Sequence, residues 1–314
     1  MRNVLLKALP SIDRAVARCR LVAGERPKLL CFMFHGLYRS GLDLDRSPVL
    51  PAQLLRLDRF RSFIERLLSH DYRVVGPETI VRGLEPDGRY AVISFDDGYY
   101  NNVLALPVLE EFNVPAVFSI AAGSVERSKA FWWDAAHRQG ASFADIADLK
   151  RLTATAIEAT LIARGAVGAL APVGDIDRPF TPDELKDFSG HRLVYLGNHT
   201  QAHARLSQLS RDDAEREIRG CQDALRRMTG RSPTVIAYPN GDYHDETIAL
   251  ARACGIEIGL TVEPRANSLP LDGSAMTLGR FGVRDDDDND ARLDIIRAEF
   301  VLSRRIGAIV RGPR

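Results

Sequence analysis

Short apolar runs alternate with amphipathic segments along most of the 314-residue chain. Each run is bounded by turn residues and predicts a buried strand. A regular alternation of strands and helices predicts an α/β fold built on a mainly parallel sheet or barrel. The predicted strands cover residues 29–34, 72–75, 91–93, 114–120, 194–198, 234–237, 256–262 and 278–281.

Apolar residues at helical spacing predict the helices between these strands. In residues 55–70 they recur at intervals of three and four positions, which is typical of an amphipathic helix. Residues 106–112 predict a second helix. Ser210 is expected to cap a long helix that Gly230 ends, and Asp213 stands where a capping box has its acidic residue.

The segment 121–190 is harder to interpret than the rest of the chain. It contains an alanine-rich, helical stretch and the only two tryptophans, Trp132 and Trp133. Clustered tryptophans usually lie in a core, but they also form walls on which sugars stack. Both interpretations stay open, and we expect this segment to shape the choice of substrate.

Residues 28–314 are expected to form a single domain with an insertion at about 121–190, since the sequence shows neither an internal repeat nor a linker. The preceding residues 1–27 are basic and carry a loose apolar face, which predicts a peripheral helix. Such a helix packs either on the protein or on an anionic membrane surface, and we expect the first. The acidic run at 285–290 predicts a solvated helix N-terminus.

Composition excludes several classes of protein. The 42 basic and 42 acidic residues cancel, so nothing indicates a nucleic-acid surface. No run of about 18 apolar residues predicts a membrane span. The four cysteines have no paired spacing, which indicates reduced thiols, and the N-terminus lacks the pattern of a secretory signal. We therefore expect a cytoplasmic protein, at the inner face of the membrane if its basic N-terminus binds lipid; no oligomeric state is predicted.

Two adjacent carboxylates, Asp96 and Asp97, follow the predicted strand 91–93, and Gly98 marks a turn. Neighbouring carboxylates resist sharing negative charge unless a cation separates their roles. One interpretation is therefore a metal ligand beside a general base. The other is an exposed Asp-Asp-Gly turn, which is common.

Histidines also follow predicted strands. His35 comes directly after the strand 29–34, and His199 and His203 come after the strand 194–198. If the backbone turns helically there, His199 and His203 face the same way and can bind one metal ion. Position 200 is threonine, so the built-in base of a HExxH motif is missing.

These motifs together resemble the polysaccharide deacetylase family, which is carbohydrate esterase family four. Its strand-end S/T-F-D-D-G matches residues 94–98, its H-S/T-x-x-H matches residues 199–203, and its third motif, a turn ending in glycine, matches residues 237–241. The resemblance covers roughly residues 28–262. It implies a distorted (β/α) barrel with about seven parallel strands.

The resemblance also implies a metal site. Asp97, His199 and His203 would hold one divalent ion, with zinc as the first expectation and iron, cobalt, nickel or manganese as alternatives. Two imidazoles and one carboxylate leave open positions for water and substrate. Asp96 would be the catalytic base.

The third motif is expected to bind the reacting amide. Backbone N–H groups at Asn240 and Gly241 would hold the oxyanion, and Tyr238 is a further candidate for substrate binding. Trp132 and Trp133 are candidates for stacking on the sugar.

The sequence departs from the family pattern in two places. A C-terminal Leu-x-His motif, the usual source of the catalytic acid, is missing, and His35 is the natural substitute. The usual arginine of the third motif is replaced by Ala237. Arg280 is expected to reach Asp96 instead and keep it ionised.

The leading hypothesis is a metal-dependent hydrolase that removes an N-acetyl or N-formyl group from an amino sugar by cleaving a linear amide bond. Its expected substrate is a lipid-linked or nucleotide-linked intermediate of surface-polysaccharide synthesis, such as O-antigen, capsule or exopolysaccharide. The alternative is a non-catalytic carbohydrate-binding relative of the same fold. A non-haem iron oxygenase is a third hypothesis, but its usual ligand order, His-x-Asp and then a distant His, is not present.

Overall fold

The computed structural model describes residues 13–39, 47–165, 168–271, 275–285 and 289–299. Its centre is a curled parallel sheet with the strand order β1-β5-β6-β7-β8-β9, in which β11 pairs with the other side of β1. A bridge between Leu260 and Leu278 brings β9 next to the segment that leads into β11. The predicted distorted (β/α) barrel is confirmed.

The strands are short, and most of their residues are buried. Short strand β4 pairs with β5, β10 runs antiparallel to β1, and β2 pairs with β3 in a separate ribbon. The strands are β1 (Lys28–Phe34), β2 (Gly36–Tyr38), β3 (Leu54–Arg56), β4 (Arg73–Val74), β5 (Arg89–Phe95), β6 (Ala116–Ile120), β7 (Val194–Asn198), β8 (Val235–Ala237), β9 (Ile258–Leu260), β10 (Asn267–Ser268) and β11 (Arg280–Gly282).

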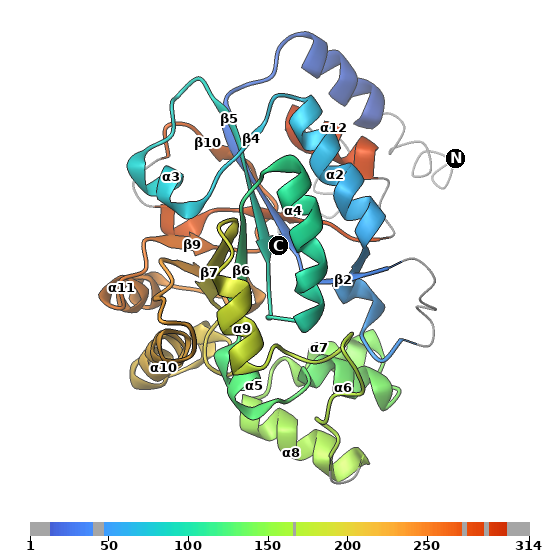
Figure 1. Cartoon of the computed structure of the whole chain (residues 1–314), viewed down its shortest axis with the longest axis vertical. Helices are drawn as coiled ribbons and strands as arrows, with labels where there is room; N and C mark the ends of the chain where they lie inside the picture. The colour runs from blue at the N-terminus through green and yellow to red at the C-terminus, as the bar shows by residue number, and fades with distance from the viewer. Residues whose placement is uncertain (1–12, 40–46, 166–167, 272–274, 286–288, 300–314) are drawn as a thin grey trace, which may run out of the picture.

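Helices surround the sheet on its outer side and at both of its ends (Figure 1). They are residues 13–22, α2 (Leu57–Ser69), α3 (Pro77–Arg82), α4 (Leu106–Phe112), α5 (Ala122–Arg127), α6 (Trp132–Arg138), α7 (Phe143–Leu149), α8 (Ala154–Gly165), α9 (Pro182–Ser189), α10 (Arg211–Thr229), α11 (Asp245–Ala253) and α12 (Asn289–Ala298). No helix among these described residues is long and apolar enough to cross a membrane.

Phenylalanine side chains join α2 to the sheet. Helix α2 buries Phe60 and Phe63, as its apolar spacing predicts. Phe95 of β5 stacks between Phe34 of β1 and Phe118 of β6. Its ring centroid lies 5.3 Å from that of Phe34 and 4.9 Å from that of Phe118. Burying these large rings gives the main core of the fold.

Side chains cap the N-termini of two helices. Ser210 caps α10 by accepting a hydrogen bond from the backbone N–H of Asp213, and Gly230 ends the helix in a left-handed conformation with φ 76°. Asp213 does not complete a capping box, because its side chain instead accepts from the Ser210 hydroxyl at 2.6 Å. Thr181 and Glu184 form a full capping box at α9.

Helices α5 to α8 belong to the segment 121–190 and are grouped at one end of the molecule (Figure 1). Helices α6 to α8 build a second apolar cluster with Leu50 and Tyr99, and Tyr99 follows the carboxyl end of β5. The insertion therefore covers the end of the barrel where α/β folds place their chemistry.

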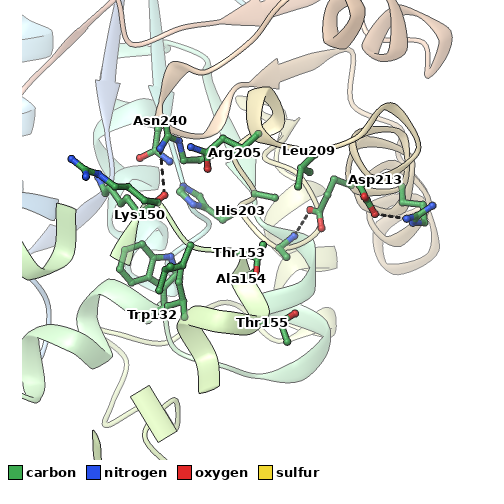
Figure 2. Close-up of a pocket in the computed structure, with 18 residues that line it drawn as sticks. Trp132, Lys150, Thr153, Ala154, Thr155, His203, Arg205, Leu209, Asp213 and Asn240 are labelled. Atoms are coloured by element: carbon green, nitrogen blue, oxygen red, sulfur yellow. Dashed lines mark hydrogen bonds and ion pairs between the residues drawn. The ribbon is translucent and has the colours of Figure 1, made fainter. Parts of the chain in front are cut away.

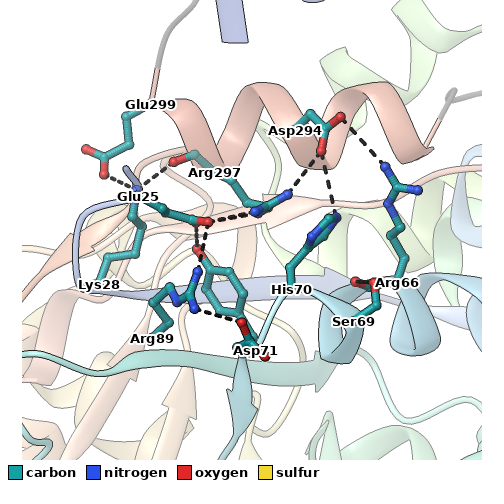
Figure 3. A network of polar contacts seen from close by, with 11 residues as sticks. Glu25, Lys28, Arg66, Ser69, His70, Asp71, Arg89, Asp294, Arg297 and Glu299 are labelled. Atoms are coloured by element: carbon teal, nitrogen blue, oxygen red, sulfur yellow. Dashed lines mark hydrogen bonds and ion pairs between the residues drawn. The ribbon is translucent and has the colours of Figure 1, made fainter. Parts of the chain in front are cut away.

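A polar network holds the opposite end together, where α12 lies against the segment before β1 (Figure 3). The buried Glu25 accepts hydrogen bonds from Arg297 at 2.8 and 3.1 Å and from the Tyr72 hydroxyl. Lys28, only 2 % exposed, donates to the Arg297 carbonyl at 2.6 Å. These contacts join the segment that precedes the first strand of the barrel to the helix that follows its last strand.

The first residue of the acidic run at 285–290 is less exposed to solvent than the sequence predicts. Asp285 is half-buried and accepts hydrogen bonds from the Tyr38 hydroxyl at 2.6 Å and the Arg56 N–H at 3.2 Å. The next three residues, and the basic tail from Arg304, lie outside the described residues.

Candidate metal centre

The end of β5 turns sharply to present two carboxylates. The Asp96 N–H donates to the Phe34 carbonyl at 2.9 Å and so continues the pairing with β1. Asp97 then adopts φ 75° and Gly98 φ 92°. A left-handed conformation is uncommon for aspartate and is tolerated where the surrounding structure fixes it. Both carboxylates are buried, Asp96 at 3 % and Asp97 at 2 % exposed, so the interpretation as an exposed turn is wrong.

Asp97, His199 and His203 come together at this turn. The Nε2 atoms of both histidines lie 3.4 Å from the Asp97 Oδ1 atom. One ligand atom of each residue lies within 4.8 Å of the others. This is the only such group of three or more metal-ligating side chains in the described part of the chain.

The loop that carries the two histidines is not helical, so the helical turn that would bring the imidazoles to one side is not what aligns them. Thr200 has φ 61° and His203 has φ 52°. Helix α10 holds the loop instead, since Glu217 accepts the Gln201 N–H on its backbone oxygen at 3.0 Å and the Ala202 N–H on its carboxylate at 2.8 Å. The two imidazoles still converge, because these contacts set the backbone path.

The three side chains fit a divalent metal ion. The Nδ1 atom of His199 lies 2.7 Å from the Ala237 carbonyl oxygen, which fixes the proton on Nδ1 and leaves Nε2 as a ligand. Asp97 Oδ2 is buried and has no hydrogen-bond partner in the described residues. A buried carboxylate oxygen without a donor is unfavourable unless a cation satisfies it.

Arg280 forms a bidentate pair with Asp96. Its two terminal nitrogens lie 2.7 Å from the two carboxylate oxygens, and Arg280 is only 1 % exposed. Burial acts to raise the pKa of Asp96, but the charge and hydrogen bonds of Arg280, together with the nearby His199 and His35, outweigh it and hold that pKa below its ordinary value. Asp96 is therefore ionised, as the sequence predicts for this pair.

Two residues that the sequence did not single out hold Arg280 in place. Its Nε donates to the Thr261 carbonyl at 2.8 Å, and one terminal nitrogen also donates to the Ser94 hydroxyl at 3.0 Å. Ser94 could have been noticed as the first residue of the matched motif at 94–98. Thr261 contributes only its backbone, so no side-chain signal could have found it.

An inner cavity of about 290 Å³ opens above the carboxylates. Its lining includes His35, Asp96, Asp97, His199, His203 and Asn240. His35 is half-buried, and burial lowers its pKa. The cavity thus brings the predicted base, metal ligands and candidate acid to one place.

The third motif contributes to the site differently from the prediction. Asn240, at φ 56°, lines the cavity. The Gly241 N–H is engaged within the turn, where it donates to the Tyr238 carbonyl at 2.8 Å. The side chain of Tyr238 is fully buried against Tyr243, with ring centroids 5.2 Å apart, and does not line the cavity. Asn240 is thus the one residue of this motif placed to face a substrate.

The two tryptophans have different positions. Trp133 is 3 % exposed, and its ring lies against His203 with centroids 4.7 Å apart. Its Nε1 donates to the Tyr99 hydroxyl at 2.8 Å, and that hydroxyl donates to Asp134 at 2.7 Å. Trp132 is half-buried and faces a pocket. Tyr99 and Asp134 were missed by the sequence analysis, because nothing local shows that they meet.

A larger outer pocket of about 690 Å³ adjoins the inner cavity (Figure 2). Its lining includes Trp132, Lys150, Arg151, Arg205, His203 and Asn240, of which Lys150, His203 and Asn240 also line the inner cavity. The remaining wall comes from residues 152–157 at the start of α8, from residues 202–209 and from α10. A substrate longer than one sugar therefore has room beside the candidate metal ligands.

Comparison with known proteins identifies the family. The family model described as polysaccharide deacetylase matches residues 83–259. This range is more than half of the chain and contains all three motifs, at residues 94–98, 199–203 and 237–241. The chain belongs to the polysaccharide deacetylase family. YxkH of Bacillus subtilis (strain 168), a protein named after the same family, is 22% identical over 250 residues, covering 78% of this chain and 68% of YxkH.

Solved structures share the fold. The Streptococcus pyogenes deacetylase PplD, solved in complex with acetate, superimposes with a TM-score of 0.61 at 17% identity, over 86% of this chain and 99% of PplD. A de-N-acetylase from Aggregatibacter actinomycetemcomitans gives a TM-score of 0.60 at 15% identity, over 85% and 99% of the two chains. At these identities the similarity establishes the barrel fold.

Proposed function

We propose that this protein is a metal-dependent de-N-acylase that hydrolyses the amide of an N-acylated amino sugar. The observation that carries the proposal is the pairing of two neighbouring carboxylates with different partners. Asp97 faces His199 and His203, while Asp96 is held by Arg280. This division provides one metal ligand and one separate base within the same turn.

Asp97, His199 and His203 would hold the ion, which would polarise the amide carbonyl and lower the pKa of a water molecule. Asp96 would accept the proton of the attacking water, because its pairing with Arg280 keeps it ionised and fixes its orientation. Protonation of Asp96 leaves the buried Arg280 without its negative partner, so Asp96 is favoured to give up that proton again and restore the pair.

His35 would supply the proton that the leaving amine needs. It is the one further histidine in the lining of the inner cavity, and the usual C-terminal histidine motif is absent from the sequence. Asn240 faces the same cavity and would orient the substrate amide.

The substrate proposed is an amino sugar that carries an acetyl or formyl group, within a lipid-linked or nucleotide-linked precursor of a surface polysaccharide. Trp132, half-buried in the outer pocket, would supply a face for a sugar ring. Zinc is the first choice of metal, since two histidines and one carboxylate are common zinc ligands.

Free-amine release tests this function. The full chain is stripped with a chelator, reloaded with one divalent metal at a time, and incubated with N-acetylated and N-formylated amino sugars, free and carrier-linked. We expect amine release that depends on the metal and is lost in Asp96→Asn. Metal bound in one equivalent without release from any substrate would contradict the proposal.

A further inference from the structure

The outer pocket beside the candidate metal ligands is lined by more basic than acidic side chains. Lys150, Arg151, Arg205 and Arg216 line it, against Asp213 and Glu217. The whole chain is neutral, with 42 basic and 42 acidic residues. The excess of positive charge is therefore a property of this place and not of the protein as a whole.

Two of the four basic groups are paired with carboxylates of this chain. Arg205 pairs with Asp242, and Arg216 pairs with Asp213. The carboxylate of Glu217 is directed to the histidine loop, where it accepts the Ala202 N–H at 2.8 Å, and burial raises its pKa. Neither acidic group is left to neutralise Lys150 and Arg151.

Of these four basic groups, Lys150 is the one that also lines the inner cavity. It caps the C-terminus of α7 and lines both the outer pocket and the inner cavity. Within the described part of the chain, its ammonium group has no hydrogen-bond or ion-pair partner. Figure 2 shows Lys150 beside His203 and Asn240, with Trp132 across the same pocket.

Arg151 adds a second positive charge at the same wall. Its partner Asp148 is 3.9 Å away, and both side chains are about three-quarters exposed. An exposed pair at that distance contributes little, so Arg151 is available to a ligand. An aromatic face beside two unneutralised cations is suited to a sugar ring that carries an anionic group.

We propose that the outer pocket binds an acidic sugar residue of the substrate, whose carboxylate or phosphate group is held by Lys150 and Arg151 while its ring lies on Trp132. This inference rests on the proposed function, since it names the class of glycan that the site accepts. The acidic residue lies next to the amino sugar whose amide faces Asp96 and Asp97. The insertion at 121–190 supplies all three side chains and so sets the substrate class.

Binding of matched sugars tests the proposal without depending on turnover. Isothermal titration calorimetry is done on the metal-loaded full chain carrying Asp96→Asn, so that bound sugar is not hydrolysed. The neutral probe is tetra-N-acetylchitotetraose. A hyaluronan tetrasaccharide supplies the carboxylate, and UDP-N-acetylglucosamine supplies the phosphate, so the two arms distinguish the sources of charge.

We expect at least one acidic probe to bind more tightly than the neutral one. Lys150→Met should weaken that acidic probe by about fivefold to tenfold, the usual effect of removing one charge-assisted contact, and leave the neutral probe unchanged. Lys186→Met is the matched control, because Lys186 is exposed on α9 and lines none of the pockets described. Rising salt should reduce only the acidic binding.

Equal binding of neutral and acidic probes, equal loss for both in Lys150→Met, or no binding of any acidic probe would overturn the inference. These outcomes leave the proposed function standing if the wild-type chain still releases amine from a neutral sugar. Loss of amine release from every substrate, with acidic binding intact, would instead overturn the proposed function alone.

Discussion

Arg280 holds both carboxylate oxygens of Asp96 at 2.7 Å, although 184 residues separate the two in the sequence. The pair is almost fully buried. In the family pattern an arginine of the third motif is expected to contact the base, and here that position is Ala237. An arginine from β11 reaches the same carboxylate from another strand of the barrel.

Replacing Arg280 should reduce both stability and activity. Arg280→Gln leaves a buried carboxylate without its partner, which costs roughly 3–5 kcal/mol in the free energy of unfolding, and the neutralised or misplaced base should lower kcat by about a hundredfold or more. Arg280→Lys keeps the charge but loses the bidentate geometry, so its effects should be smaller. Thermal unfolding and amine release measure the two effects. Equal activity of Arg280→Gln and the wild type would contradict the assigned role.

The two neighbouring carboxylates should respond differently to the same substitution. Asp97→Asn removes the charged metal ligand, and metal affinity should fall by at least about a hundredfold. Asparagine tolerates the left-handed backbone of this position, so the fold should survive. Asp96→Asn should keep the metal and lose activity by about 10²-fold to 10⁴-fold. Metal content by mass spectrometry and amine release separate the two variants, and identical behaviour of both would refute the division of roles.

Glu217 should control metal affinity without touching the metal. Its carboxylate accepts the Ala202 N–H at 2.8 Å and so fixes the loop between His199 and His203. Glu217→Ala leaves that N–H without its acceptor, and we expect metal affinity to fall by about 10-fold to 100-fold. Competition with a chromophoric chelator measures this affinity. Glu215→Ala, at an exposed position of α10 that contacts Arg219, is the control and should bind metal as the wild type does.

Asp134 should make the stability of the protein depend on pH. Burial raises its pKa to about 8, against the hydrogen bonds from Tyr99 and Leu50 that favour the charged form. The folded protein therefore binds a proton that the unfolded chain releases near pH 4. Stability should fall as the pH rises from about 4 to about 8.

Asp134→Asn tests this pH dependence. The amide resembles the neutral acid, since it can accept from the Leu50 N–H and donate to the Tyr99 oxygen. The unfolding temperature of the wild type should fall between pH 5 and pH 8, and that of the variant should change much less. Both are measured with a chelator present, so that metal binding does not contribute. Asp187→Asn, exposed on α9, should leave the profile unchanged. A wild-type profile that rises over this range would show that Asp134 is ionised in the folded protein.

The ties between α12 and the segment before β1 should support stability and not activity. Glu25→Ala leaves Arg297 and the Tyr72 hydroxyl without their buried acceptor, which costs roughly 3–5 kcal/mol. Amine release at low temperature should stay unchanged, because α12 lies at the end of the barrel opposite to helices α5 to α8, which cover the site (Figure 1). A loss of kcat at a temperature where the variant is folded would contradict this separation.

The sequence by itself determined the order of the central strands and of the helices outside the insertion, because burial of short apolar runs and amphipathic faces is a local property that repeats along the chain. It also showed which residues stand at strand ends, and in parallel sheets these ends meet at one edge. Asp96, Asp97, His199, His203 and His35 could therefore be grouped before their distances were known. Contacts that depend on the final path of the backbone could not be derived in this way.

The tertiary structure alone decided the contacts between distant segments. The loop at 199–203 is left-handed at two residues because α10 holds it, Tyr238 turns into the core, and Asp134 meets Tyr99 only after the insertion packs over the barrel. Lys150 likewise reaches the site from the segment 121–190. The sequence predicted helix in that segment but not where it lies relative to the barrel. Local propensity fixes which element a residue joins, whereas packing of whole elements fixes which side chains face each other.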